Sequence, residues 1–424
     1  MKKILSILAL ILVLAFVFAS CKNDENAKND VTTPEATEVT SSTTLEETTP
    51  EPPKEPFPTS HGLAYEVNED GVTCTITGIG TCTDGDVYIG GYIDGYKVIT
   101  IKKRAFKDCS NLTSVTIGDF VTTVDRYAFE NCTNLTSATL GNSVTTIGLD
   151  AFKDCSNLTT VTMGNSVTTI GSRAFHCCPK LTNVTIPNSV TIIGNHAFEG
   201  CSTLTNVTIP DSVTDIGSYA FRYCTNLASV TIPDSVISIG SEAFDYCNSA
   251  LYTEYEYGKY VGDSINPYTA LIELTDKNMS TYTIHPDAKV IVFEVFQNCE
   301  SLTSITIPDG VRGIGFSAFN GCINLTSVAI PDSVITIDAH AFYNCSNLTN
   351  INIPDSVIII EVGAFYGCSK LSSVTFTTLN SWECEDYYDS TNVKSISASD
   401  LSNPETAAQY LKDTYNDYDW RRIE

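Results

Sequence analysis

The chain has 424 residues and a formal net charge of −26, from 24 basic and 50 acidic side chains. Because the acidic residues are spread widely and the basic ones form no cluster, this charge argues against nucleic acid as a partner and against electrostatic adsorption to anionic lipid. The sequence after residue 60 is also longer than one compact hydrophobic core usually accommodates.

The first feature along the chain is a predicted signal peptide, residues 1–20. Two lysines precede an apolar run, residues 4–18, that is too short for an ordinary membrane span. The run ends in the sequence FASC at residues 18–21, which resembles the lipobox of bacterial lipoproteins. This resemblance implies that Cys21 becomes the lipidated first residue. A plain cleaved signal is the alternative, because Phe18 departs from the usual aliphatic residue.

Residues 21–60 are predicted to form a disordered tether that begins at the lipidated Cys21. The segment is rich in Thr, Pro, Asp and Glu and has almost no large apolar side chains, so it cannot bury enough surface to fold. Such a tether would hold the folded part away from a membrane. The predicted location is therefore the cell surface, with the exported protein contacting the membrane only through its lipid anchor.

Eleven phenylalanines then recur along the chain, with steps of 23 residues and one step of 52. They are Phe106, Phe129, Phe152, Phe175, Phe198, Phe221, Phe244, Phe296, Phe319, Phe342 and Phe365. Each is followed three residues later by a cysteine. This spacing predicts a repeat array in which neighbouring coils stack.

One repeat, residues 220–242, shows the physical pattern. Val230 and Ile232 alternate with a threonine, which predicts a short strand with both apolar side chains on one face. Pro-Asp-Ser then predicts a turn, and Ile239 belongs to a second extended piece. Gly240 is predicted to end that piece at a positive φ. Coils stacked ~4.8 Å apart would make a rod or arc of roughly 50 Å.

The pattern resembles the BspA-type leucine-rich repeat of bacterial surface proteins over residues 62–376. The predicted fold is a mainly β solenoid, a leucine-rich repeat array of eleven 23-residue coils. An N-terminal β cap is predicted at 61–97, repeats at 98–250 and 279–376, and a C-terminal cap containing a helix at 377–424. The resemblance implies adhesion to host matrix proteins or to other cells.

The 52-residue step contains a tyrosine-rich insertion, residues 251–278, predicted as a hairpin that protrudes from the solenoid. Its tyrosines either form a contact surface or pack on neighbouring coils. The candidates for contact are Tyr252, Tyr255, Tyr257 and Tyr260.

The cysteines of the repeat share one slot and are predicted to be buried, unreactive thiols. Cys74 and Cys82 lie outside that pattern, and they either pair as a disulfide or stay reduced. Cys177 has no predicted partner. No zinc site is predicted, because the chain has no C-x-x-C pair. A row of aspartates in the turns, of which Asp211 is the first, is predicted to accept backbone hydrogen bonds, with Ca²⁺ binding as the alternative.

No catalytic residue or cofactor is predicted, and the chain is not expected to be an enzyme. Its five histidines form no recognised motif. His196 and His340 occupy the position just before Ala-Phe, which holds many residue types in other repeats. That position is therefore predicted to be exposed and free of packing constraints.

Residue types vary most around Ala-Phe, and there the sequence predicts one exposed cluster from adjacent coils: Tyr219, Arg222, Tyr223 and Tyr246. Tyr and Arg often anchor protein interfaces, although neutral drift on a solvated edge would look similar. The predicted function is a monomeric surface lipoprotein that mediates protein interaction or adhesion, and its expected ligand is a macromolecule, with protein as the favoured class. The alternatives are a structural or presentation module of a surface assembly and a glycan-active hydrolase.

The lipid anchor gives a first test. Metabolic labelling with a palmitate analogue should mark the wild-type chain, because Cys21 directly follows the short apolar signal and its small residues. The Cys21→Ala variant should stay unlabelled at equal expression. Equal labelling of both chains would contradict the assignment.

Overall fold

The computed structural model describes residues 59–423. The predicted signal peptide, Cys21 and nearly all of the predicted tether lie outside the described residues. The described chain is a β solenoid of about 13 turns of ~23 residues, as the periodicity predicts. Eleven of these turns carry the Phe-x-x-Cys pair.

The solenoid begins with short strands that lead into the first coil. β1 is antiparallel to β2, and β2 is parallel to β5, so the cap joins the row of strands that the repeats continue. The strands are β1 Ala64–Val67, β2 Thr73–Gly78, β3 Asp86–Ile89, β4 Tyr92–Ile93 and β5 Tyr96–Ile101.

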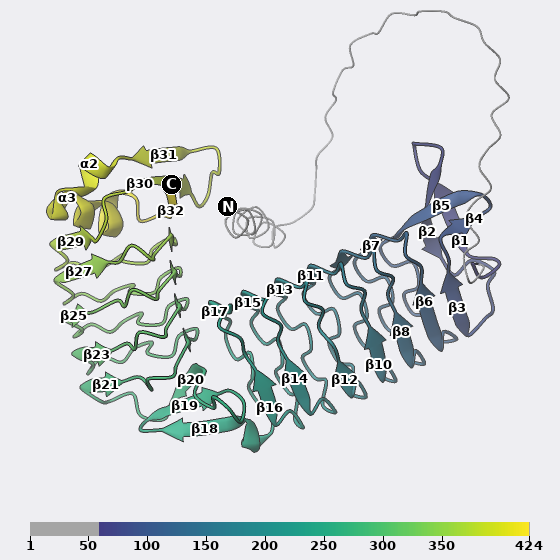
Figure 1. Ribbon diagram of the computed structural model, residues 1–424, viewed down its shortest axis with the longest axis horizontal. Helices are drawn as coiled ribbons and strands as arrows, with labels where there is room; N and C mark the ends of the chain where they lie inside the picture. The colour runs from purple at the N-terminus through teal and green to yellow at the C-terminus, as the bar shows by residue number, and fades with distance from the viewer. Residues whose placement is uncertain (1–58, 424) are drawn as a thin grey trace, which may run out of the picture. The chain divides into compact units, whose positions relative to one another are not determined.

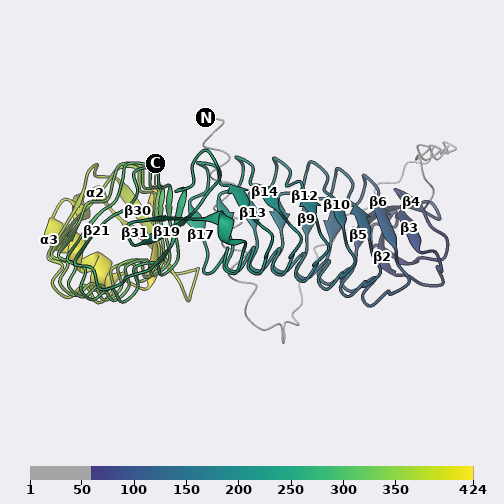
Figure 2. The same cartoon turned by 90° about the horizontal axis from the view of Figure 1, so that it is seen from below.

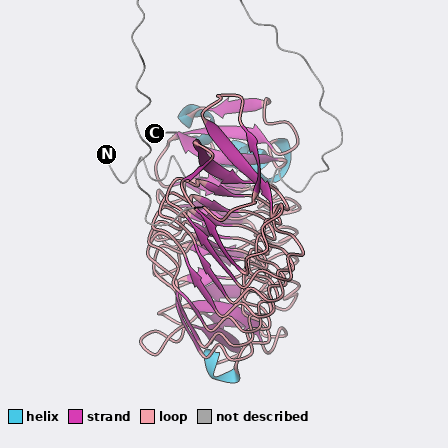
Figure 3. Ribbon diagram, turned by 90° about the vertical axis from the view of Figure 1, so that its right-hand side faces the viewer, coloured by secondary structure: helices cyan, strands magenta, loops and turns pink. Residues whose placement is uncertain are grey.

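Each coil of the first run contributes two short strands, and these pair in parallel with the strands of the next coil, except that the threonine-rich row is interrupted between β12 and β14 (Figures 1 and 3). The threonine-rich row is β6 Ser114–Ile117, β8 Ser137–Thr139, β10 Thr160–Thr162, β12 Asn183–Val184, β14 Asn206–Thr208 and β16 Ser229–Thr231. The second row is β7 Thr123–Val124, β9 Thr146–Ile147, β11 Thr169–Ile170, β13 Ile192–Ile193, β15 Asp215–Ile216 and β17 Ser238–Ile239. Figure 2 shows the same coils from below as consecutive loops.

The insertion differs from its prediction, because it does not simply protrude. The short helix η1 Ser249–Leu251 leads into β18 Tyr252–Tyr255 and β19 Gly258–Val261, which form an antiparallel hairpin. β19 also pairs with β20 Ala270–Leu274, and β20 is parallel to β22. The hairpin thus starts a second sheet, and the array is divided into two runs of coils (Figure 1).

The second run repeats the same two rows and ends in a cap. Its strands are β21 Thr281–Thr283, β22 Val290–Ile291, β23 Ser304–Thr306, β24 Gly313–Ile314, β25 Ser327–Val328, β26 Thr336–Ile337, β27 Asn350–Ile353, β28 Ile359–Ile360 and β29 Ser373–Phe376.

The cap covers the last coil with its own strands and helices. β32 pairs antiparallel with β28, and Trp382 of β30 and Trp420 of β32 are both buried. Asn403 caps α3, as its sequence predicts, by accepting hydrogen bonds from Glu405 and Thr406. The cap elements are β30 Ser381–Asp386, β31 Val393–Ile396, α2 Ala398–Leu401, α3 Pro404–Gln409, η2 Tyr410–Thr414 and β32 Tyr418–Ile423.

The repeated phenylalanines form two continuous stacks through the core. From Phe106 to Phe244, and again from Phe296 to Phe365, neighbouring rings lie 4.9–5.5 Å apart at interplanar angles of 4–11°. All eleven side chains are at most 1% exposed. Each ring therefore packs mainly on its own equivalents one coil away.

The repeated cysteines are free thiols, and most of them form hydrogen bonds between coils in addition to packing in the core. In nine coils the Sγ donates to the backbone carbonyl of the phenylalanine one coil earlier, at 3.0–3.3 Å; Cys132 to Phe106 is an example. Burial raises the pKa of the Cys155 thiol to about 12, which keeps it protonated and unreactive. Cys74 and Cys82 are also free and buried.

Gly240 has a different structural reason from the predicted one, because its φ is not positive. A Cβ on Gly240 would overlap the backbone nitrogen of Ser218 in the preceding coil. Glycine is required there by the close approach of two backbones. The positive φ angles instead flank the phenylalanine, at the residue before Ala-Phe and at the second residue after it.

The two runs contact each other directly at the inner side of the insertion. Ser238 of β17 donates to Asp338, which follows β26, at 3.3 Å although the two residues are 100 apart in sequence. Lys289 lies 3.4 Å from Asp234. A Cβ on Gly313 would overlap the carbonyl oxygen of Ile237. The backbones of β17 and β24 therefore meet without room for a side chain.

One carboxyl group is buried at this contact, and two others nearby, Asp215 and Glu361, are partly buried. Asp338 is 8% exposed and accepts from Thr336 at 3.0 Å, and Glu361 accepts from the Ala339 backbone at 3.0 Å. Burial raises the pKa of both carboxyl groups. The negative charge of Asp215 adds to the effect on Asp338, and the negative charge of Asp338 adds to the effect on Glu361. Burial also raises the pKa of Asp215. Below their raised pKa values these groups fit the contact as neutral acids.

The ring stack predicts which side chains carry stability. Phe198→Ala should lower the free energy of unfolding by about 3–5 kcal/mol, because it leaves a cavity between two stacked rings. Thr208→Ala, on the exposed side of β14, should cost less than about 1 kcal/mol. Denaturant unfolding of both variants measures the difference. Similar losses would mean that the inner and outer positions are reversed.

The buried acids predict a pH dependence. Each carboxyl with a raised pKa stabilises the fold while it is protonated, and this contribution is lost as pH rises through the raised value. The thermal midpoint should therefore fall between about pH 5 and about pH 8, and Asp338→Asn should reduce the fall. Asp309→Asn, at an exposed turn, is the matched control and should leave the fall unchanged. An identical pH profile in wild type and Asp338→Asn would contradict this account.

Candidate interaction surface

The cluster expected from the sequence lies on the edge of the coils formed by the Ala-Phe segments. Tyr219 directly precedes Ala-Phe in one coil, and Arg222 and Tyr223 directly follow it. Tyr246 occupies the position of Tyr223 in the next coil. Because adjacent coils are hydrogen bonded here, for example from Tyr223 to Asp245 at 2.9 Å, equivalent side chains become neighbours.

Arg222 is the centre of this group. Its guanidinium carbon lies 4.8 Å from the ring centre of Tyr223, 5.1 Å from that of Tyr219 and 5.4 Å from that of Tyr246. The rings of Tyr223 and Tyr246 stack with centres 4.8 Å apart. A guanidinium at these distances is attracted by the ring faces, so the four side chains hold one another in place.

One acidic side chain and one imidazole extend the group. Glu242 pairs with Arg222 at 3.1 Å, and the ring of His196 stacks on Tyr219 with centres 4.6 Å apart. Tyr223 and Tyr246 nevertheless remain 42% and 59% exposed. The aromatic face is thus ordered by its neighbours while still accessible to a partner.

The four insertion tyrosines do not join this surface as one set. Tyr260 is fully buried and bonds to the hydroxyl of Tyr282 at 3.2 Å, so its inclusion in an exposed surface is wrong. Tyr252 is half-buried and donates its hydroxyl to the Phe244 carbonyl at 2.6 Å. Tyr255 packs edge-on against His285, and only Tyr257, at 50%, is largely exposed. Most of these rings pack on neighbouring coils, because the hairpin closes the start of the second run.

The position before Ala-Phe was expected to be exposed and unconstrained, and this expectation is wrong. Asp150 and Ser317 are buried there at 4% and 2% exposure, and every non-glycine residue at this position has a φ between 50° and 63°. His196 and His340 are both partly buried. The position before Ala-Phe accepts many side chains because what is constrained there is the backbone, which must adopt a positive φ.

The second left-handed position, two residues after the phenylalanine, is more selective. Eight of its eleven occupants are Asp, Asn or Gly, the residues that tolerate a positive φ best. The three exceptions are Cys177, Tyr223 and Tyr246, with φ of 55°, 58° and 57°. The aligned repeats show that these three residues differ from the others at this position. Only the φ angles show that the position requires a left-handed backbone.

No helix in the described part of the chain is long and apolar enough to cross a membrane. The family model described as BspA type leucine-rich repeat region matches residues 94–205, 191–265 and 276–408, in six copies. The chain belongs to this family. The expectation drawn from the repeat pattern is therefore confirmed.

Solved structures of bacterial leucine-rich repeat proteins are similar to the chain. A leucine-rich repeat protein from Bacteroides ovatus is 23% identical, with 74% of this chain and 93% of that chain covered and a TM-score of 0.37. A leucine-rich cell surface protein from Faecalibacterium prausnitzii is 26% identical, with 77% and 96% covered and a TM-score of 0.35. The pneumococcal vaccine antigen PcpA is 21% identical, with 75% and 80% covered and a TM-score of 0.34. A search of curated proteins gives no match.

The BspA-type solenoid is a fold of bacterial surface proteins that suggests protein–protein interaction. Its members are typically binding scaffolds without catalysis. In this chain the strand faces are nearly uniform, whereas the edge formed by the Ala-Phe segments carries the side chains that differ from coil to coil. That edge is therefore where the coils of this chain differ most from one another.

Proposed function

We propose that this chain is a surface-attached binding protein whose aromatic edge cluster, Tyr219, Arg222, Tyr223 and Tyr246, captures a protein partner. The observation that carries the proposal is the Arg222 guanidinium held against three tyrosine rings, two of them largely exposed. Rigid Tyr and Arg side chains that are already ordered lose little conformational entropy on binding. They are also the residue types most common at binding hot spots.

The threonine-rich strand row is a less suitable contact surface. The threonines that directly precede these strands bond within the solenoid, as in Thr136 Oγ1 to the Thr113 carbonyl and Thr159 Oγ1 to the Thr136 carbonyl, each at 2.9 Å. The outward residues of the strands themselves are nearly all Thr, Ser or Asn in every coil, so the row offers little that distinguishes one coil from another. It supports the array and leaves recognition to the edge.

The proposed setting is the exterior of a bacterial cell, with Cys21 as a lipid anchor and residues 22–60 as a tether. There the solenoid would adhere to host matrix or to other cells. A presentation module in a surface assembly is the second candidate, because the same aromatic edge could bind another envelope protein. No described feature favours a glycan-active hydrolase.

A binding screen tests the proposal. The purified chain is screened against matrix proteins, mucins and extracts of the producing cell's own envelope. For any partner found, Tyr223→Ala and Arg222→Ala should each weaken binding at least about tenfold, the size expected of hot-spot side chains. Binding is measured by surface plasmon resonance.

Thr208→Ala and Thr231→Ala serve as matched controls, because both are exposed strand residues in nearby coils, and they should change affinity less than about twofold. A partner that depends on these threonines and ignores Arg222 and Tyr223 would contradict the proposal. A partner found only in the envelope extract would favour the presentation module over adhesion.

A further inference from the structure

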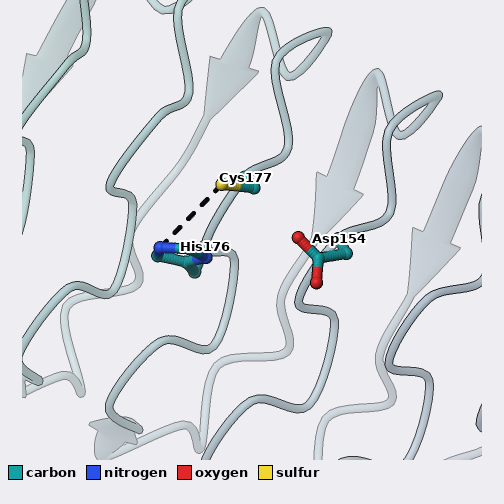
Figure 4. Close-up of side chains that lie close together, drawn as sticks. All are labelled: Asp154, His176 and Cys177. Atoms are coloured by element: carbon teal, nitrogen blue, oxygen red, sulfur yellow. Dashed lines mark hydrogen bonds between the residues drawn. The ribbon is translucent and has the colours of Figure 1, made fainter.

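The edge position that carries Tyr223 and Tyr246 also gathers a second, chemically different group in earlier coils. Asp154 and Cys177 occupy this position in adjacent coils, and His176 directly precedes Cys177 (Figure 4). One ligand atom from each residue lies within 4.8 Å of the other two. The expectation of no metal site rested on local spacing, and it could not detect ligands that come from two coils.

The His176 ring is oriented by a carboxylate. Its Nε2 lies 3.4 Å from Glu199 Oε2 and 3.8 Å from Cys177 Sγ, whereas its Nδ1 is buried without a hydrogen-bond partner. When Nε2 carries the proton and donates it to Glu199, Nδ1 keeps a free lone pair. A carboxylate behind a histidine is the usual support of a metal-binding imidazole.

The backbone and the next coil leave room at the sulfur. Cys177 has a φ of 55° at a position where eight of eleven coils have Asp, Asn or Gly, so cysteine is not the residue that the backbone favours. The next coil has Gly200 at the same position. A Cβ there would lie 3.4 Å from Cys177 Sγ, and a longer side chain would cover the sulfur. Cys177 is therefore partly exposed, whereas the neighbouring core thiol of Cys178 is buried.

We propose that Asp154, His176 and Cys177 bind Zn²⁺, with a fourth position open to water or to a side chain of a partner. Sulfur, nitrogen and oxygen together are a donor set that Zn²⁺ accepts, whereas Ca²⁺ and Mg²⁺ prefer oxygen alone. One thiolate and one carboxylate also balance the charge of the ion. Coordination to Zn²⁺ removes the Cys177 proton to solvent, and the thiolate is the bound form.

One cation competes with the metal for this group. Lys153 Nζ lies 3.7 Å from Asp154 Oδ2 and 4.0 Å from Glu130 Oε1. Ion pairs at this degree of exposure contribute little, so Asp154 can exchange Lys153 for a doubly charged ion. Lys153 retains Glu130 as its partner after the exchange.

The purified, reduced chain tests the site with Zn²⁺ in isothermal titration calorimetry and with Co²⁺ in absorption spectroscopy. We expect one ion per chain and a thiolate-to-Co²⁺ charge-transfer band. Cys177→Ser should abolish the band, and His176→Ala and Asp154→Asn should weaken Zn²⁺ binding. Glu199→Gln should weaken it about 10–100-fold, the usual cost of losing a supporting partner.

Two variants serve as matched controls. His340→Ala removes another partly buried histidine, whose pKa burial lowers, and Cys247→Ser removes another partly buried thiol. Both should keep full binding. Thermal unfolding without metal separates loss of the site from loss of the fold, and Asp154→Asn should leave that midpoint unchanged. Absence of stoichiometric Zn²⁺ binding, or binding that survives both Cys177→Ser and His176→Ala, would overturn the proposal.

Discussion

The constraint on which the structure depends is that each residue must stack on the residue 23 positions away. Equivalent residues in successive coils pair in parallel, so the same slot must suit its own copies above and below. Phenylalanine satisfies this by ring stacking, and cysteine satisfies it by donating its thiol to a carbonyl of the preceding coil. If a side chain packed poorly against its equivalent in the next coil, the poor contact would recur at every interface between coils.

Stacking also explains why the edge is the variable part of the molecule. At the two left-handed positions beside the phenylalanine, the backbone N–H groups bond directly to the next coil, as Asp154 does to the His176 carbonyl at 2.9 Å. The backbone conformation there is fixed by the array, and the side chain is free to change if it tolerates a positive φ. Tyr223, Tyr246 and Cys177 are residues for which that conformation is costly, about 1–2 kcal/mol each. Such a cost is consistent with side chains kept for recognition or for metal binding.

The sequence was sufficient for the features that the period determines. The solenoid and the contact among Tyr219, Arg222, Tyr223 and Tyr246 follow from counting in steps of 23. The strand around Val230 follows from its apolar alternation, and the helix at Asn403 from its start signal. The sequence was insufficient where the insertion interrupts the 23-residue period, and where a residue's role depends on distances between coils. The burial of Tyr260 depends on how the hairpin joins the second sheet, and the reason for Gly240 is a distance between backbones.

The contact between the two runs of coils is the feature that the repeat pattern predicts least. Ser238 and Asp338 are 100 residues apart, and each occupies an ordinary position within its own repeat. Asp338 and Glu361 take the place that glycine holds in Gly240 and Gly315, where coils approach too closely for a side chain. Asp338 at this place faces the first run and accepts a hydrogen bond from Ser238 of β17, whereas Glu361 accepts one from the backbone of Ala339 within the second run. The insertion therefore determines which repeat positions become an interface, and identical slots in the two runs acquire different chemistry.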